Sequence, residues 1–198
     1  QLKQEDYGLS FLPADNPEIA TFQSINKEFG GLDAALVGIE TDDVFDPEFL
    51  IKLQATTTAL SALPNLGHVL SITNVTDFHE DPMGGVVAGM LVPAIPKTEA
   101  EQAALRASVL ARDHIRGSLV SEDGTAVVLV AFAGFRADPQ AVAGDIQRIV
   151  SDQFPGESIY WGGAPFISTY IFQTTLEDLR RLSPWAVAAI MLIMVFAF

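Results

Sequence analysis

The residues best suited to chemistry form an acidic run near the middle of the chain. Asp77, His79, Glu80 and Asp81 offer oxygen and imidazole ligands close together, as a divalent metal site requires. Ligands this near in sequence converge only in a tightly folded loop, and a solvated acidic loop is the commoner meaning of such a run. We therefore expect a solvated loop here, with metal binding as the alternative.

The other chemical motifs are weaker. Gly162-Gly163-Ala164-Pro165 resembles a phosphate-cradling loop at a helix N-terminus, but no Lys, Ser or Thr stands at the phosphate-gripping position. The small residues fit a sharp turn from strand to helix instead. Neither a serine nucleophile elbow nor a P-loop lysine motif is present, and His68 and His114 have no motif partners. We expect no catalytic residue, no cofactor and no metal ion, and therefore no enzyme.

Composition excludes several classes of partner. The net charge is -14, with 11 Lys and Arg against 25 Asp and Glu, whereas nucleic acids and anionic lipid surfaces attract clustered basic residues. The chain has no cysteine, which excludes disulfides, thiolate metal sites and thiol catalysis but is compatible with either redox compartment.

The C-terminal residues 185–198, WAVAAIMLIMVFAF, are all apolar. A bilayer-spanning helix needs about 20 apolar residues, so we read this segment as the first part of a truncated transmembrane helix. The alternative is a buried core helix, which is also apolar all round. No signal peptide is visible at residue 1, so if the domain lies outside the cytoplasm, we expect an upstream transmembrane helix to deliver it there.

Capping residues and apolar periodicity predict the helices. Asp46 and Asp138 each precede a proline at the first helical position, and Thr98-x-x-Glu101 forms a capping box. The helices are expected over residues 17–29, 47–63, 98–113 and 139–153, and from 165 through 182 into the apolar tail.

Short β-branched runs predict the strands at residues 34–39, 68–75 and 158–161. A hairpin is expected from residues 119–121 and 125–132, which flank the turn-forming Asp123-Gly124 pair. Residues 76–97 are predicted to be irregular, because glycines and prolines interrupt their apolar stretch.

Two strand–helix–strand units of similar length predict an α+β fold, a ferredoxin-like split βαβ sandwich with an inserted loop and helix. Its sheet would be antiparallel with both helices on one face, leaving the other face for a neighbouring domain. The expected divisions are residues 1–32, a linker and helix; 33–163, the sandwich with an insertion at 76–116; and 164–198, a connecting helix running into the transmembrane segment.

An ordered set of four motifs resembles the first extracytoplasmic domain of the resistance-nodulation-division (RND) exporters. The motifs are LPADNPEIATFQSINKEFGG, AALVGIETDDVFDPEFLIKLQATTTALSALPNLGHVLSITNVTDF, SEDGTAVVLVAF and YWGGAPFISTYIFQTTLEDLRRLSPWAVAAIML. The chain is most similar to the third hydrophobe/amphiphile efflux group and the MMPL-like lipid exporters. The resemblance runs from about residue 12 to 198, except over residues 81–96.

This resemblance implies a porter domain on the extracytoplasmic side of the cell membrane. Its partners would be a second pseudo-symmetric domain and the transmembrane helices of the same full-length protein, and its cargo hydrophobic or amphiphilic molecules such as lipids. The proton-relay residues of such exporters lie in membrane helices outside this sequence. Arg180 and Arg181 beside the apolar segment favour the opposite topology by the positive-inside rule. The adjacent Glu177 and Asp178 do not remove this conflict, because acidic residues contribute little to the rule, but two arginines are a small signal and we follow the resemblance. The alternative is a membrane-anchored extracytoplasmic sensor or ligand-binding module; an enzyme on that face has only the acidic loop in its favour.

Two segments are candidates for movement in such an exporter. The first is a hinge at Gly162, Gly163 and Pro165, through which the second membrane helix would move the sandwich. The second is a flexible apolar flap that lines the substrate path or touches the outer leaflet, because methionine and glycine make an adaptable apolar surface. Alternatively, the same stretch covers the open sheet or contacts the partner domain. The flap residues are Met83, Gly84, Gly85, Met90 and Leu91.

Overall fold

The computed structural model describes residues 33–80, 85–134 and 137–197, together with Thr21, Ser24, Ile25 and Glu28. Those four residues are helical, in agreement with the helix predicted over residues 17–29, whose other residues lie outside the described part of the chain. In chain order the elements are β1 (Ala34–Glu40), α2 (Pro47–Ser61), β2 (Leu66–Leu70), β3 (Thr76–Glu80), β4 (Val86–Met90), α3 (Glu99–Leu110), β5 (Ala126–Ala133), α4 (Pro139–Gln153), β6 (Ser158–Gly163) and α5 (Ala164–Ala197).

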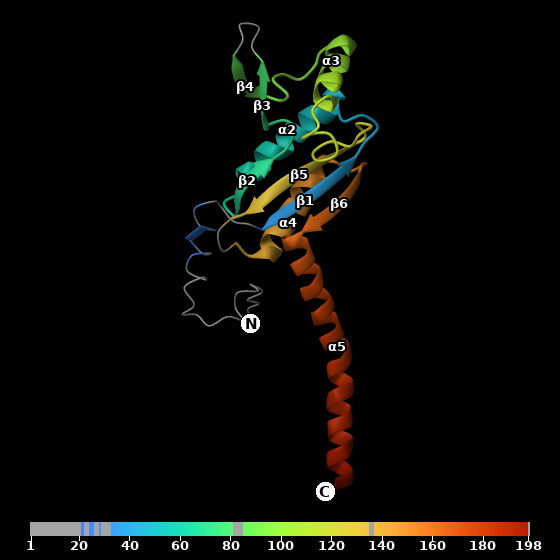
Figure 1. Ribbon diagram of the computed structural model, residues 1–198. Helices are drawn as coiled ribbons and strands as arrows, with labels where there is room; N and C mark the ends of the chain where they lie inside the picture. The colour runs from blue at the N-terminus through green and yellow to red at the C-terminus, as the bar shows by residue number, and fades with distance from the viewer. Residues whose placement is uncertain are drawn as a thin grey trace.

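A four-stranded antiparallel sheet has the order β2-β5-β1-β6 (Figure 1). Val37 of β1 pairs with Leu129 of β5 on one side and with Trp161 of β6 on the other. The two strands of each strand–helix–strand unit therefore enclose a strand of the other unit, so neither unit forms this sheet by itself. The expected mixed α/β class with an antiparallel sheet and an apolar C-terminal helix is confirmed.

Helices α2 and α4 begin as predicted. Asp46 accepts hydrogen bonds from two backbone N–H groups of α2 at 2.9 and 3.0 Å, and Asp138 accepts one from α4 at 3.1 Å. These N–H groups lack an acceptor within the helix, so the side-chain caps stabilise each start. Pro47 and Pro139 follow the caps, where the missing N–H of proline costs no hydrogen bond.

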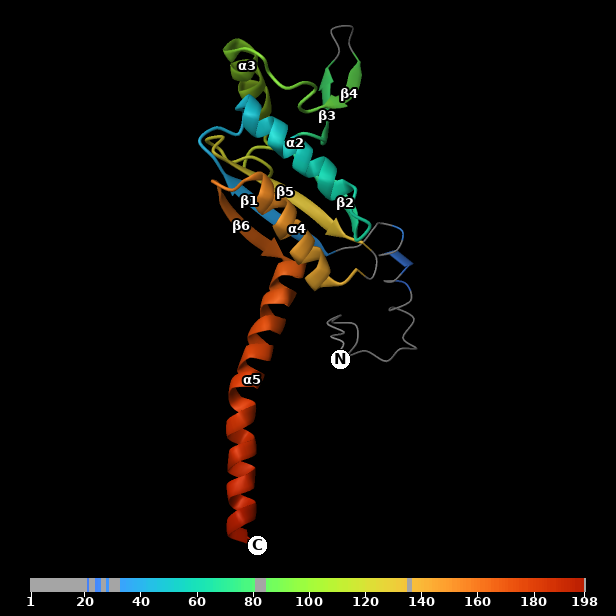
Figure 2. The ribbon, with the colours of Figure 1, turned by 180° about the vertical axis from the view of Figure 1, so that it is seen from behind.

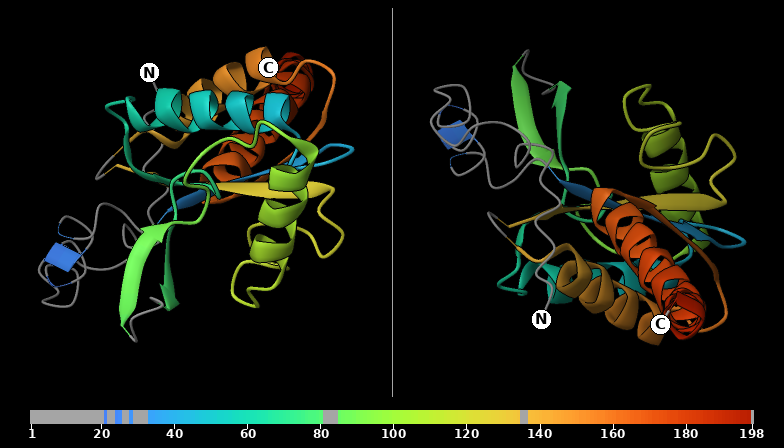
Figure 3. Two further views of the ribbon diagram at one scale, coloured as in Figure 1. Left: turned by 90° about the horizontal axis from the view of Figure 1, so that it is seen from above. Right: turned by 90° about the horizontal axis from the view of Figure 1, so that it is seen from below.

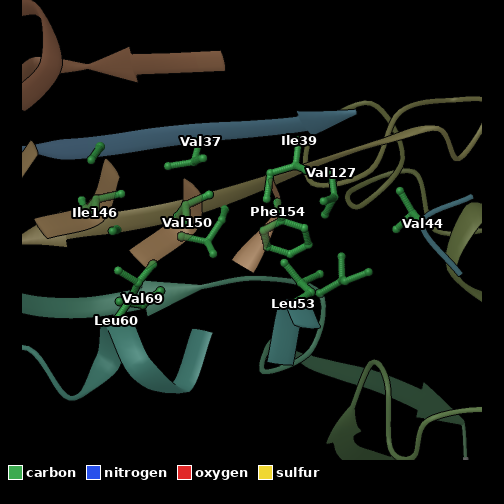
Figure 4. Packing of buried hydrophobic residues seen from close by; sticks show 14 of the residues in the cluster. Val37, Ile39, Val44, Leu53, Leu60, Val69, Val127, Ile146, Val150 and Phe154 are labelled. Atoms are coloured by element: carbon green, nitrogen blue, oxygen red, sulfur yellow. The ribbon is translucent and has the colours of Figure 1, made fainter. Parts of the chain in front are cut away.

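The hydrophobic core lies between the sheet and helices α2 and α4, which pack on the same face (Figure 2). The rings of Phe49 on α2 and Phe154 after α4 have centroids 5.4 Å apart. Burial of each large apolar side chain contributes about 1.5–3 kcal/mol, so this cluster is the main source of stability. Figure 4 shows its centre, which includes Val37, Ile39, Val44, Leu53, Leu60, Val69, Val127, Ile146, Val150 and Phe154.

The strand predicted over residues 68–75 is wrong in its boundaries. β2 ends at Leu70, and residues 71–74 form a turn. The side chain of Asn74 accepts a hydrogen bond from Ser71 N at 2.8 Å and donates one to Val69 O at 2.7 Å. Asparagine side chains stabilise turns by bonding nearby backbone groups in this way, so β-branched composition alone overestimates the strand.

The irregular loop predicted over residues 76–97 is also wrong, because it contains a β-hairpin. β3 and β4 pair in antiparallel register, with Thr76 opposite Met90 and Phe78 opposite Ala88. The glycines and prolines suggested a loop, but β3 ends before Pro82 and pairs with β4, which itself includes Gly89. The first arm predicted at residues 119–121 is reduced to a bridge between Val120 and Val127.

Helix α3 and the β3–β4 hairpin stand on the side of the sheet opposite α2 and α4, as both views in Figure 3 show. Thr98 caps α3 as predicted, since its Oγ1 accepts from Glu101 N at 3.2 Å. The second bond of the predicted capping box differs, because the Glu101 carboxylate accepts from Lys97 N, one residue before the cap, at 2.7 Å. The helix ends at Leu110 rather than near Asp113.

Helix α5 is continuous over 34 residues, a length of about 50 Å. Its first turns contact α4, β6 and β1, and the rest extends away from the domain (Figures 1 and 2). Residues 181–196 are all exposed, so the apolar segment is not a core helix within the described structure. The predicted continuation of the helix into the apolar tail is confirmed, and Pro184 lies inside it.

Candidate functional site

The face of the sheet opposite α2 and α4 is largely apolar and open, because α3 and the β3–β4 hairpin stand on that side without packing closely on its strands. Alternate residues of a strand point to opposite faces, so every second residue of β1 and β5 lies on this open face. Leu36 on it is 41% exposed and Tyr160 is 58% exposed. The strand register arranges the open face in rows: Ala34, Phe132 and His68; Gly162, Leu36, Val130 and Leu70; Tyr160, Gly38 and Val128; and Ser158, Glu40 and Ala126.

A shallow groove of about 180 Å³ lies at the end of the open face away from α5. Gly38 and Val128 line it from the two central strands, Tyr160 and Glu40 border one side, and residues 117–121 border the other. A Cβ on Gly38 would lie 3.6 Å from Tyr160 Cβ, an ordinary contact. Glycine is therefore not required there by the backbone, but its lack of a side chain leaves the groove open.

Glu40 and Tyr160 form the polar end of this groove. The Tyr160 hydroxyl donates a hydrogen bond to Glu40 Oε2 at 3.1 Å. The hydrogen bond and negative charge of Glu40 raise the pKa of Tyr160 above its ordinary value. A carboxylate accepts about four hydrogen bonds, which leaves Glu40 able to bind a further donor or a cation. Sequence reasoning did not identify these residues, because neither belongs to a motif and only the strand register brings them together.

The far border of the groove is held in place by backbone hydrogen bonds to β5. Val128 N donates to Leu119 O at 2.8 Å, and Ser121 N donates to Ala126 O at 2.9 Å. The following turn has the positive φ predicted for Gly124, at 76°. Hydrogen bonds from Ser121 and Thr125 lower the pKa of Asp123 in that turn to about 2, so its carboxylate is charged at neutral pH.

The predicted hinge residues lie at the junction of β6 and α5. Gly163 is the last residue of β6, pairs with Ala35 and has a φ of 89°. A Cβ on Gly163 would overlap the Ala34 carbonyl oxygen and lie 3.0 Å from the carbonyl carbon. A Cβ on Gly162 would lie 3.7 Å from Leu36 Cβ, an ordinary contact. The predicted strand-to-helix turn is confirmed, and Gly163 is required by its close approach to β1; hinge motion itself stays a prediction.

Helix α5 is firmly attached to the domain at its start. Pro165 and Phe166 are buried, and the Phe166 ring lies 5.3 Å from the Trp161 ring between centroids. Among the described helices, this one alone, over Ala164–Phe196, is long and apolar enough to cross a membrane, and its apolar window is not buried. A core helix of similar composition would be buried, so exposure favours a membrane segment.

The predicted flap corresponds to the β3–β4 hairpin and the residues after it. Met83 and Gly84 lie outside the described residues. Gly85 is exposed, Met90 is 51% exposed, and Leu91 is only 5% exposed and belongs to the core. Figures 1 and 2 place the hairpin at the end of the domain away from the C-terminus of α5. The flap function stays a prediction, for which the exposed Met90 is better suited than the buried Leu91.

The solvated loop expected for the acidic run is wrong, because residues 77–80 belong to strand β3 and the first acidic residue of the run, Asp77, is buried. Asp77 is 4% exposed and forms an ion pair with Arg112, and His114 Nε2 lies 3.5 Å from its second oxygen. Burial alone would raise the pKa of Asp77, but the hydrogen bond and charge of Arg112 outweigh it and hold the pKa below 3.8. This cluster fastens the hairpin to the segment after α3. Asp81 lies outside the described residues, and no group of three or more potential ligands within the described part of the chain could hold a metal ion.

Comparison with known proteins adds no relative. No protein-family model matches the chain, and no curated protein is similar in sequence. The functional argument therefore depends on the geometry of the open sheet face, the hairpin and α5.

Proposed function

We propose that this chain is the extracytoplasmic domain of a proton-driven membrane exporter of hydrophobic or amphiphilic molecules, of the RND and MMPL-like kind that its sequence resembles. The observation that carries this proposal is the direct connection of an open apolar sheet to an exposed apolar helix, without a linker between β6 and α5. The fold that we infer is the ferredoxin-like split βαβ sandwich. The strand order β2-β5-β1-β6, with α2 and α4 on one face, supports this assignment.

The proposed mechanism is conformational rather than catalytic. Phe166 packs against Trp161, and α5 packs against α4, so a tilt of α5 in the membrane would move the sheet and its helices together. Any flexibility at Gly162-Gly163 has to preserve the close contact between Gly163 and β1. The domain would thus respond to movement of the second membrane helix as one body.

The proposed location is the extracytoplasmic side of the cell membrane. A second pseudo-symmetric domain of the same full-length protein would stand opposite the open face, with the exposed Leu36 and Tyr160 still accessible to cargo between the two domains. That partner and the remaining transmembrane helices would supply the proton pathway and the walls of the transport cavity.

The transport activity of the full-length protein tests this proposed function. Inverted membrane vesicles should accumulate a fluorescent lipid analogue when a pH gradient is applied, and a protonophore should abolish the uptake. Phe166→Ala should slow uptake because it loosens the attachment of α5, whereas Tyr170→Ala, which removes a ring that is 71% exposed on the same helix, should leave it unchanged. Uptake insensitive to the gradient and to Phe166→Ala would contradict the exporter.

The side of the membrane is measured separately. Because the chain lacks cysteine, a single Asp152→Cys change on the exposed end of α4 gives one labelling position in this domain. An impermeant maleimide should label that cysteine in intact cells, and labelling only after lysis would place the domain in the cytoplasm. External labelling without transport would favour the second candidate, a membrane-anchored ligand-binding module, which the groove at Gly38 and Tyr160 supports.

A further inference from the structure

We propose that the open sheet face binds the apolar tail of a cationic amphiphile, whose positively charged head group lies against Glu40. The inference rests on the proposed function, since the ligand would be cargo of the exporter, and it defines a chemical class and a site for that cargo. The site consists of the apolar rows on β1 and β5 together with the groove that ends them.

The apolar rows form a track along the two central strands. Phe132 lies at the α5 end, Leu36 and Val130 lie opposite each other in the next row, and Val128 follows in the groove. From Phe132 to the row of Glu40 the strands advance six residues, or roughly 20 Å. A track of this length suits the alkyl chain of a membrane amphiphile, and it begins at the end of the sheet where α5 leaves the domain.

The charge at the far end of the track selects the head group. Among the described residues that line the groove, Glu40 is the only charged one, and Tyr160 beside it presents an aromatic ring. A carboxylate attracts an ammonium group, and the face of a tyrosine ring attracts cations as well. The net charge of -14 adds a long-range attraction for cations and repulsion of anions.

The hydroxyl donors of the groove do not favour an anionic head group. Ser118 Oγ donates to His114 O at 2.5 Å, and Ser121 Oγ donates to Asp123 Oδ1 at 2.6 Å. The Tyr160 hydroxyl donates to Glu40. The side-chain donors among the described groove residues are thus already engaged, so a phosphate or sulfate group would meet a carboxylate without receiving compensating hydrogen bonds.

The test measures binding to the whole chain, held in an amphipathic polymer, by methyl NMR. Dodecyltrimethylammonium, dodecyl sulfate and dodecyl maltoside are titrated below their micelle concentrations. We expect saturable shifts of the Leu36 and Val128 methyl groups with the cationic probe, while the methyl signals of Val142, a core residue on the buried side of α4, stay unchanged. Affinity for the cationic probe should exceed that for dodecyl sulfate about tenfold, a difference equivalent to about 1.4 kcal/mol.

Three variants separate the contribution of the Glu40 charge from that of overall charge and from that of the open groove. Glu40→Gln should weaken binding of the cationic probe about fivefold and leave the maltoside unaffected, as expected for an exposed ion pair. Glu122→Gln makes the same change of charge on an exposed residue outside the groove and should have no effect beyond experimental error. Gly38→Leu places a side chain in the groove and should abolish the Val128 shift while the core methyl signals stay in place.

Several results would overturn the inference. They are equal affinity for the cationic and anionic probes, equal loss of affinity in Glu40→Gln and Glu122→Gln, or shifts confined to α5. Concentration-dependent shifts of Leu36 without any probe would show that a second copy of the chain occupies the face instead. Cationic binding without gradient-driven transport would refute the exporter and leave the site intact, whereas gradient-driven export without binding at Leu36 and Val128 would refute only the site.

Discussion

Replacing Gly163 with alanine should be far more damaging than replacing its neighbour Gly162. Gly163 has a φ of 89°, a backbone conformation that costs a non-glycine residue about 1–3 kcal/mol. The new Cβ would also overlap the Ala34 carbonyl oxygen, so β1 and β6 would have to separate at the Ala35–Gly163 pair. Loss of a backbone hydrogen bond there adds about 1 kcal/mol. We expect a total loss of about 3 kcal/mol, a large share of the roughly 5–15 kcal/mol that stabilises a typical domain.

Gly162→Ala is the matched control. Its Cβ would meet Leu36 Cβ at 3.7 Å, and removal of a glycine from a strand stabilises the strand by about 0.5–1 kcal/mol. The free energy of unfolding is measured by urea titration of the chain in mild detergent, with Trp161 fluorescence as the signal. Both variants carry Trp185→Phe, because the chain contains 2 tryptophans and Trp185 lies in the apolar part of α5.

If the free energies of unfolding of Gly163→Ala and Gly162→Ala differ by less than about 0.5 kcal/mol, the close approach of β6 to β1 does not require glycine at position 163, and our reasoning is wrong. This comparison also bears on the hinge hypothesis. A transport defect in a Gly163 variant would report misfolding as readily as lost motion, whereas Gly162→Ala changes backbone freedom without a steric clash. The hinge should therefore be tested at Gly162.

Three measurements concern the charged groups. Asp77→Asn should lower the free energy of unfolding, measured by urea titration, by about 2 kcal/mol. This is less than the loss expected for a fully buried ion pair, because the Arg112 side chain is 24% exposed. Asp113→Asn, which breaks an exposed ion pair, should lower it by at most about 0.5 kcal/mol. The pKa of Asp77 in the folded state lies below 3.8, so the stability that its ionised carboxylate contributes is present above that pH and is lost as the pH falls through the folded pKa. The difference in unfolding free energy between the natural chain and Asp77→Asn should therefore shrink on acidification. A difference that does not change with pH would contradict the ion pair. Asp123 should titrate near pH 2 by carboxyl NMR, and Ser121→Ala should move that midpoint toward 3.8; an unchanged midpoint would exclude the Ser121 hydrogen bond as its main cause.

Local interactions explain what was predictable from the sequence. The starts of α2, α3 and α4 depend on Asp46, Thr98 and Asp138, each of which bonds backbone groups within the next few residues. The apolar part of α5 was evident from residues 185–198, because composition along one helix needs no distant contact to be recognised, whereas its exposure was decided by the structure. The turn at Gly124 was similarly local.

Contacts between residues distant in the chain determined the features that the sequence did not predict. The hairpin was mistaken for a loop because strand pairing between Thr76 and Met90 competes with the loop tendency of glycine and proline, and composition does not show which prevails. The amphiphile site proposed here depends on the hydrogen bond between Tyr160 and Glu40, and the attachment of the hairpin depends on the ion pair between Asp77 and Arg112. Both contacts join residues that are far apart in the chain. Residue types and spacing therefore determined the helices and the apolar tail, whereas the open face, the groove and the strict need for Gly163 arose only when β1 came to lie between β5 and β6.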